Sequence, residues 1–299
     1  MPSAQKLLED YLDYLEIEKN RSVRTREAYE RYLKSFFMAA GVASLEDITS
    51  EAIRNFRLKL ARTKDDQEFL KKSTQSYYAI AIRNFLKYLV KKGYNVMAPD
   101  QIELPKVPQR QIEIPSYSDL ARLLAAPPRG DLRSLRDRAI LEFLFSTGLR
   151  LAELCGLNRY LDFKRGELTV RGKGDKLRVV FISPSAQKAV KEYLDKRPDA
   201  GESLFISLTK NGSVIGRITP RAVQRLVDYY GRKAGITKRI TPHKLRHLFA
   251  TDLLINGADL HSVQELLGHS NVSTTQAYTH LTNKELKEVH QAFHARRRR

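Results

Sequence analysis

Histidines gather at one end of this 299-residue chain: all seven lie between His243 and His294, and none precedes them. Thr241 is the predicted N-cap of a helix and Pro242 suits its first position, so His243 falls in the first turn. Free backbone N–H groups and the helix dipole attract an anion there. His243 and Arg246, three residues apart, share one helix face. The spacing predicts a phosphate-binding site, although a solvated surface pair is the alternative.

The same helix allows a metal-binding interpretation. His243 and His247 lie four residues apart, the spacing of a zinc-protease helix. Lys244 stands where that chemistry requires a glutamate base, and a cation beside the metal would repel it. Paired carboxylates at metal-ligand spacing are also absent from the sequence of the candidate site. We therefore expect no bound metal and no other cofactor.

A second candidate anion ligand is Arg150. It follows Gly148, which ends a strongly apolar predicted helix, and it begins the next segment. An arginine between two segments of buried character is available to hold an anion. Glu153, three residues later, offers a purely structural partner instead. This motif alone leaves both interpretations open.

A third motif places His269 and Tyr278 nine residues apart near the C-terminus. The segment from Ser262 to His280 also fits a helix-turn-helix, with Gly268 at the turn. Its supposed recognition helix contains no Arg or Lys, which is a poor composition for reading bases. The non-catalytic interpretation is therefore weaker than one in which these side chains do chemistry.

The charge of the chain identifies the kind of partner. Lys plus Arg number 53 against 34 Asp plus Glu, a formal net charge of +19. Repulsion among unmatched cations destabilises a compact protein, so such a chain usually offers them to a polyanion. Nucleic acid is the first candidate and a membrane surface the second. A hydrophobic fraction of 42% excludes disorder of the whole chain.

The sequence also restricts the compartment. No run of 18 apolar residues and no signal-peptide core are present, so we expect a cytoplasmic protein. Cys155 is the single cysteine, which excludes an internal disulfide and fits a reducing compartment. Leu154 and Leu157 flank it, and this predicts a buried cysteine rather than a catalytic one.

Two domains must position these residues. Residues 1–93 predict four amphipathic helices whose polar faces are rich in Lys and Arg. Residues 94–115 carry four prolines and predict an extended linker. The second domain, 116–299, opens on a capping box, Ser116-x-x-Asp119. The predicted fold class is mainly α, with a second domain that mixes helices and a small amount of β-structure.

That β-structure is one predicted hairpin. Its strands are Glu167–Arg171 and Leu177–Ile182, and Lys173 lies in the turn between them. The helices predicted after the hairpin are 184–196, 219–234, 241–255, 259–267 and 282–294. The last of them is amphipathic, and it fits packing into a neighbouring protomer as well as packing on its own chain.

Five motifs occur in one order along the chain. They are Thr147-Gly148-Leu149-Arg150-x-x-Glu153-Leu154, Gly172-Lys173-Gly174, Thr241-Pro242-His243-x-x-Arg246-His247, Leu267-Gly268-His269-Ser270, and Thr274-Thr275-Gln276-x-Tyr278-Thr279-His280. In order and spacing they resemble the tyrosine site-specific recombinases of the phage integrase family, most of all the Xer type. The first 93 residues are similar to the SAM-like core-binding domain of that family. The resemblance covers nearly the whole chain.

The resemblance implies that Tyr278 attacks a DNA phosphodiester, leaving a 3′-phosphotyrosine and a free 5′-hydroxyl. A phenol has a pKa of about 10, so it needs a proton acceptor or a cationic neighbourhood to become a nucleophile. His243 is the candidate base. Arg150 and Arg246 would stabilise the charge on the non-bridging oxygens, and His269 would add a hydrogen bond.

Lys173 completes the implied site as general acid for the leaving 5′-oxygen, a role worth about 10² to 10⁴ in rate. Two guanidinium groups would replace a metal ion, and the phosphotyrosine would keep the bond energy, so no ATP is needed. The sequence has no Gly-x-x-x-x-Gly-Lys-[Ser/Thr] loop, which agrees with that expectation.

The resemblance also implies the partners. Two domains would clamp double-stranded DNA at a specific recombination site, and four protomers, identical or of two kinds, would exchange strands through a Holliday junction. Resolution of chromosome dimers is the expected role. The alternatives are an integrase of a mobile element, a type IB topoisomerase, and a DNA-binding protein without activity. A requirement for an activating protein stays open.

Overall fold

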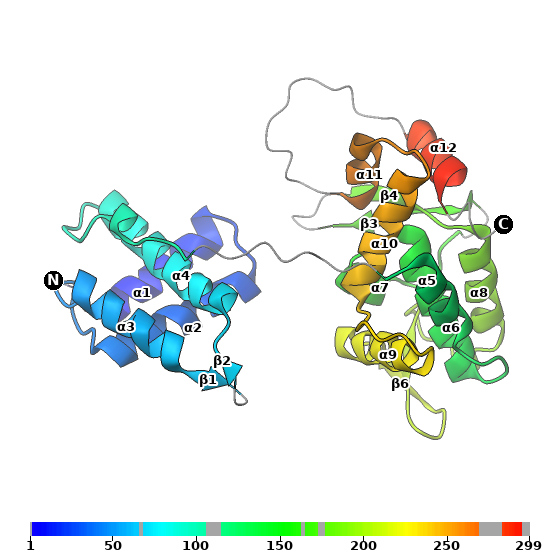
Figure 1. The fold of residues 1–299 in the computed structure, drawn as a ribbon, viewed down its shortest axis with the longest axis horizontal. Coiled ribbons are helices and arrows are strands. Elements are labelled where there is room, and N and C mark those ends of the chain that lie inside the picture. The colour runs from blue at the N-terminus through cyan, green and yellow to red at the C-terminus, as the bar shows by residue number, and fades with distance from the viewer. Residues whose placement is uncertain are drawn as a thin grey trace. The chain divides into compact units, whose positions relative to one another are not determined.

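The computed structural model describes residues 2–65, 68–105, 115–162, 165–172, 177–268 and 283–294. The chain forms two compact units, residues 1–111 and 112–299 (Figure 1). Each unit is described by itself. Within the described ranges, every helix is too short or too polar to cross a lipid bilayer.

The N-terminal unit is a helical bundle. Its elements are α1 (Ala4–Asp13), the short π-helix η1 (Tyr14–Glu18), α2 (Val23–Ala40), α3 (Ser50–Arg62) and α4 (Lys72–Lys91). Helices α2 and α4 pack on each other, and α1 and α3 each pack on both. Apolar residues at helical spacing, among them Leu8, Phe36 and Phe85, fill the shared core. The four predicted helices are confirmed.

One small element of this unit was not predicted. A hairpin of two-residue strands, β1 (Lys64–Asp65) and β2 (Glu68–Phe69), joins α3 to α4. The sequence predicted only helices before residue 93, and that part of the prediction was wrong. Strands of two residues are too short to produce a recognisable alternation.

Part of the proline-rich stretch belongs to this bundle. A 3-10 helix, η2 (Pro99–Gln101), follows α4, and Ile102 is buried in the bundle core. Met97 packs against the same core. Residues 106–114 lie outside the described part of the chain. The described beginning of the predicted linker is therefore held by the N-terminal unit.

The second unit is mainly helical with small antiparallel sheets. Its helices are α5 (Tyr117–Ala125), α6 (Leu132–Thr147), α7 (Leu151–Gly156), α8 (Pro184–Asp195), α9 (Pro220–Lys233), α10 (Pro242–Ile255), α11 (Leu260–Leu267) and α12 (Asn283–Phe293). Its strands are β3 (Glu167–Arg171), β4 (Leu177–Phe181), β5 (Ile206–Leu208) and β6 (Val214–Arg217). The predicted fold class, the hairpin β3–β4 and the capping box at Ser116 are confirmed. A second hairpin, β5–β6, was missed.

Helix α6 is the centre of this unit. It is buried on nearly all sides and packs against α5, α8, α9 and α10. It ends at Gly148, whose φ of +58° is the left-handed conformation that favours glycine. A Cβ at Gly148 would lie 2.4 Å from the ring of Phe249 on α10. The end of α6 and the face of α10 are therefore in direct backbone-to-ring contact.

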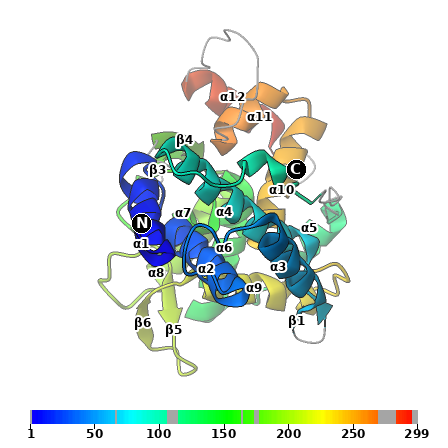
Figure 2. The same cartoon turned by 90° about the vertical axis from the view of Figure 1, so that its left-hand side faces the viewer.

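The C-terminal helix α12 packs on its own chain. It contacts α10, α11 and β4, and it lies beside α11 in both views (Figure 1, Figure 2). Phe293 and Val289 join a small core with Phe249. His290 is buried, and its Nε2 lies 2.8 Å from the carbonyl oxygen of Ser146 on α6. Helix α12 therefore packs against α10, α11 and the end of α6.

Candidate active site

Arg246 lies inside the second unit, where it joins two helix ends. The predicted cap of α10 is confirmed, since the Thr241 side chain accepts a hydrogen bond of 3.2 Å from the Lys244 backbone N–H. Arg246, one turn later, is buried. Its Nη1 donates to the carbonyl of Gly148 and its Nη2 donates to the carbonyl of Leu267 at 2.6 Å. The guanidinium thus links the end of α6 to the end of α11.

Arg150 also binds the end of α11. It caps α7, and its backbone N–H donates to Glu153 Oε2 at 2.7 Å. Its Nη1 donates to Glu153 Oε1 at 3.0 Å, and its Nη2 donates to the carbonyl of Gly268, also at 3.0 Å. Arg150 therefore pairs with Glu153, the structural partner that the sequence suggested, and its Nη2 also binds the end of α11.

Arg150 and Arg246 therefore bind consecutive backbone carbonyls, those of Gly268 and Leu267. His269 is the next residue along the chain. Three motifs that are far apart in the sequence meet at this point. Because the anchors are neutral carbonyl groups, they orient the two guanidinium groups without cancelling their charge.

A third arginine, Arg178 on β4, belongs to the cluster and was missed by the sequence reasoning. Its Nη1 and Nη2 donate to the two carboxylate oxygens of Glu153 at 2.8 and 2.7 Å. The Arg178 side chain is 11% exposed and that of Glu153 is 7% exposed. A signal was available: Arg178 shares a strand face with Val180, which is buried, so the alternation directs it inward.

The cluster holds three cations around one carboxylate. Burial, and then the nearby charges of Arg150 and Arg178, lower the pKa of Arg246 to about 10, although Glu153 opposes the shift. Arg246 still carries its charge at neutral pH. Burial alone would raise the pKa of Glu153, but hydrogen bonds from Arg178 and Arg150 bring it below its ordinary value. The cluster is therefore cationic and suited to an anion.

His243 and His247 lie together on α10. Their Nε2 atoms are 2.9 Å apart, and their rings meet edge to face with centroids 4.4 Å apart. His243 is exposed and His247 is half-buried. Burial lowers the pKa of His247, and the charges of His243 and Arg246 add to that effect. Among the described residues, no set of three or more His, Cys, Asp or Glu side chains is arranged to hold a metal ion.

Three predicted site residues fall outside the described ranges: Lys173, His269 and Tyr278. The flanks of the first two are placed. Gly172 and Leu177 border residues 173–176, which include Lys173 and lie outside the described ranges, and Gly268 precedes His269. The predicted helix-turn-helix segment, 262–280, is described only as far as residue 268. The structure thus brings together Arg150 and Arg246, with His243 on the helix that carries Arg246.

Cys155 has the structural role that its flanks predicted. It is buried in the core of the second unit, next to Leu154 and Leu157. Burial raises the pKa of its thiol to about 11. The thiol is therefore protonated at neutral pH, which is unsuited to nucleophilic catalysis.

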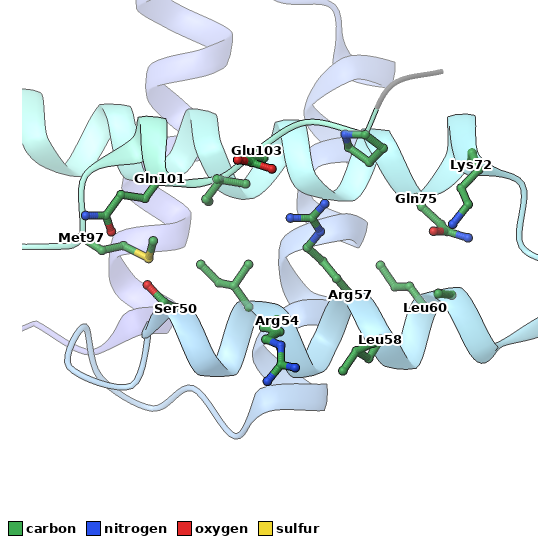
Figure 3. Close-up of a pocket in the computed structure, with 14 residues that line it drawn as sticks. Ser50, Arg54, Arg57, Leu58, Leu60, Lys72, Gln75, Met97, Gln101 and Glu103 are labelled. Carbon is green, nitrogen blue, oxygen red and sulfur yellow. The ribbon is translucent and has the colours of Figure 1, made fainter. Parts of the chain in front are cut away.

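The N-terminal unit carries a separate basic groove of about 500 Å³ between α3 and the chain that follows α4 (Figure 3). Ile53, Leu60 and Ile102 contribute apolar lining, and Arg57 extends from α3 into the gap, whereas Arg54 points away from it. Arg57 is half-buried. Arg54, Arg57 and Lys72 outnumber Glu103 in the lining, so the groove has a net positive charge.

Comparison with known proteins decides the family. Residues 116–285 match the phage integrase family, and residues 8–93 match the N-terminal SAM-like domain of phage integrases. The chain belongs to the phage integrase family. It is 38% identical to tyrosine recombinase XerC of Pelobacter propionicus, over 95% of this chain and 94% of that protein. It is 36% identical to tyrosine recombinase XerD of Listeria monocytogenes serotype 4b, over 97% and 99%.

Solved structures of this family share the fold. A lambda integrase dimer bound to a core site has a TM-score of 0.70 at 17% identity, covering 94% of this chain and all of that one. XerH recombinase bound to its difH substrate has a TM-score of 0.63 at 23% identity, covering 94% and 82%. The predicted resemblance is confirmed: this phage integrase family member is a tyrosine recombinase with a SAM-like domain and a catalytic domain.

Proposed function

We propose that this tyrosine recombinase cuts and rejoins DNA at a specific site through a 3′-phosphotyrosine formed on Tyr278. One observation carries the proposal: Arg150 and Arg246, from separate elements, bind adjacent carbonyls immediately before His269. Both guanidinium groups are fixed and keep their charge. A phosphate placed against them would receive charge-assisted hydrogen bonds, which are about twice as strong as neutral ones.

The reaction then proceeds as one displacement at phosphorus. The phenol oxygen of Tyr278 forms a bond to phosphorus as the bond from phosphorus to the 5′-oxygen breaks. His243 takes the phenol proton, and Lys173 supplies a proton to the 5′-oxygen. Religation is the same step in reverse, with the 5′-hydroxyl of the incoming strand as nucleophile.

The phosphorane-like transition state gathers charge on its non-bridging oxygens. Arg150 and Arg246 stabilise that charge, and His269 adds a hydrogen bond. Removing one such donor from a preorganised site typically costs about 10² to 10³ in rate. Because these side chains supply the positive charge and the phosphotyrosine keeps the bond energy, the reaction needs neither a metal ion nor ATP.

Within the family we propose the Xer role, resolution of chromosome dimers in the cytoplasm. Relatives named XerC and XerD match nearly the whole chain at 36–38% identity, which supports this role over integration of a mobile element. A lambda integrase tetramer bound to a Holliday junction shares the fold, with a TM-score of 0.70 at 15% identity. Four protomers, identical or of two kinds, would accordingly act on two double-stranded DNA sites.

The chemistry is tested with Tyr278→Phe on nicked DNA that carries the recombination site, found by mapping cleavage in the host genome. The wild-type protein should form a covalent adduct that survives denaturation. Tyr278→Phe should form none while its DNA affinity stays within about twofold, because only the nucleophile is lost. Tyr160→Phe, at a tyrosine that is 75% exposed, is the matched control. An adduct on Tyr278→Phe would place the nucleophile elsewhere.

The Xer role is tested by the position of that cleavage site. A single chromosomal site, with plasmid dimers resolved when they carry it, is the expected result. A site at the ends of a mobile element would favour the integrase alternative. Relaxation of a supercoiled plasmid that lacks the site would favour a topoisomerase.

A further inference from the structure

We propose that Arg178 is a positioning residue: through Glu153 it fixes the guanidinium of Arg150 at the phosphate site and ties the β3–β4 hairpin to that site. The inference rests on the proposed function and deepens it. Arg178 itself would not touch DNA, because Glu153 binds both of its terminal nitrogens and its side chain is almost entirely buried.

The hydrogen bonds of Glu153 show how the positioning works. Arg178 occupies both carboxylate oxygens, and the Arg150 backbone N–H also binds Oε2. Arg150 therefore keeps a single side-chain bond to Glu153, from Nη1 to Oε1. Its Nη2 is left to reach the carbonyl of Gly268. Without Arg178, the free carboxylate could take both arms of Arg150, and the link to Gly268 would be lost.

The pairing needs an arginine rather than a lysine. The planar guanidinium presents two N–H groups that match both oxygens of a carboxylate, whereas an ammonium is a point charge that binds them one at a time. A buried carboxylate left with a single partner is costly, because its desolvation is no longer compensated. Lys at this position would keep the charge of Arg178 but not the geometry.

Gly268 allows Arg178 to take this position. A Cβ at Gly268 would lie 2.8 Å from Arg178 Cδ and 3.2 Å from its Nε, closer than side-chain atoms normally approach. The Arg178 side chain thus lies directly against the backbone that accepts from Arg150. One residue contacts both partners of Arg150, Glu153 by hydrogen bonds and Gly268 by packing.

The same pair anchors the hairpin. In the β3–β4 register, Arg171 pairs with Leu177, and Lys173 lies between them in the sequence. Arg178 follows Leu177 directly, so its bonds to Glu153 hold β4 near its first residue. The hairpin and the arginine cluster therefore share one fixed point, and the orientation of Arg150 depends on where β4 lies.

The test compares Arg178→Met and Arg178→Lys in single-turnover cleavage by the full chain. We expect cleavage to fall about 10²-fold for Met and at least tenfold for Lys, the scale of a 1 Å misplacement of a catalytic group. DNA affinity should stay within about threefold. Cleavage by Arg178→Met at the wild-type rate would overturn the proposal.

A second substrate separates positioning from a general loss of structure. A methylphosphonate at the scissile position removes the charged non-bridging oxygen, so cleavage depends less on Arg150. The defect of Arg178→Met should shrink there to within a few fold of wild type, as it should for Arg150→Ala. An equal defect on both substrates would mean that Arg178 is only structural.

The matched control is Arg217→Met. Arg217 on β6 is exposed, but its Nη1 donates to the carbonyls of Cys155 and Leu157, so its loss removes hydrogen bonds that involve neither Glu153 nor Arg150. Any defect it causes should be the same on both substrates. If Arg178→Met is too unstable to purify, two other variants replace it in the comparison. They are Arg178→Lys and a double variant that combines Glu153→Gln with Arg178→Met. The double variant should be more active than Arg178→Met, because no carboxylate remains to draw Arg150 away from Gly268.

Tyr278→Phe keeps the two proposals apart. If that variant still forms an adduct, the proposed function fails, and the role of Arg178 fails with it. If Tyr278→Phe forms no adduct but Arg178→Met cleaves the phosphodiester normally, the function stands and the role of Arg178 is overturned.

Discussion

The Nε2 atoms of His243 and His247 lie 2.9 Å apart, the distance of a hydrogen bond in which one ring donates its proton to the other. Burial lowers the pKa of His247 and so favours its neutral form, whose Nε2 accepts when the ring proton is on Nδ1. When His243 donates the proton of this hydrogen bond, its own Nδ1 carries a lone pair and can take the proton of a phenol. In the proposed reaction, His247 would therefore favour the tautomer in which His243 is the base.

We therefore predict that His247→Leu slows cleavage about tenfold, because His243 loses its acceptor. His247→Gln should recover part of the rate, since its amide oxygen can accept. His243→Ala should lose more, about 10² to 10⁴, the range for a general base. Single-turnover adduct formation measures all three, and a normal rate for His247→Leu would show that the contact with His243 has no catalytic effect.

Arg246→Lys is predicted to be defective in both stability and rate. A lysine cannot bind two carbonyls on opposite sides, so the Gly148 or the Leu267 carbonyl is left buried without a partner, at a cost of about 1–3 kcal/mol. Cleavage should fall at least 10²-fold, as for loss of a preorganised donor. Chemical denaturation and single-turnover cleavage measure the two effects.

Arg232→Lys is the control for that substitution. Arg232 pairs with Asp228 on the exposed face of α9, and surface pairs of this kind contribute little. Its stability and cleavage rate should match the wild type. An Arg246→Lys variant that behaves like Arg232→Lys would show that the bridge between α6 and α11 is dispensable.

Gly268→Ala should impair cleavage more than stability. Its φ of +62° is left-handed, so alanine adds about 1 kcal/mol of strain, and the new Cβ would also displace Arg178 from Glu153. Gly41→Ala separates the two effects, because Gly41 has a φ of +65° at the end of α2 and open space around its Cβ. We expect the larger melting-temperature loss in Gly268→Ala, because it also disturbs a buried ion pair, and a cleavage defect in Gly268→Ala alone.

Acid is predicted to loosen α12. Burial, and then the charge of His294, lower the pKa of His290 to about 3, although Ser146 and Asp252 oppose the shift. A group whose pKa is lowered on docking contributes fully above its free value of about 6.5, and this contribution is lost as pH falls from there toward 3. The equilibrium constant for undocking of α12 should therefore rise by up to about tenfold for each unit by which the pH falls in that range.

Hydrogen exchange of the α12 amides at pH 7.5 and 5.5 measures this effect after correction for the intrinsic rates. His290→Gln is the control, because its amide can donate to the Ser146 carbonyl without titrating. It should flatten the pH dependence. Equal protection of the wild-type helix at the two pH values would contradict the prediction.

Much of the fold follows from local patterns. Apolar spacing of 3.6 residues located the four helices of the bundle and the five after the hairpin, and turn residues located β3–β4. Hairpin β5–β6 was missed because its strands have only three and four residues. The second strand also contains Gly216, a residue type that is depleted in strands. Strands that short are fixed by tertiary contacts rather than by their own sequence.

The site was predictable only in its parts. Motif spacing identified Arg150 and Arg246, and α10 begins where Thr241 and Pro242 predicted. Both arginines bind carbonyls at the end of α11, and this depends on how α6, α10 and α11 pack. No local sequence pattern encodes contacts between residues so far apart in the chain. Arg178 was missed because its partner, Glu153, is 25 residues away, and the sequence suggested Arg150 as the possible partner of that carboxylate.

The carbonyl anchors at the end of α11 bear on how this site tolerates genetic change. A carbonyl oxygen belongs to the main chain, so no substitution at position 267 deletes the acceptor for Arg246 as long as α11 keeps its course. Side chains around these carbonyls can therefore change by mutation while the carbonyl acceptors remain in place. Position 268 has no such freedom, because its backbone conformation and the nearby Arg178 both require glycine.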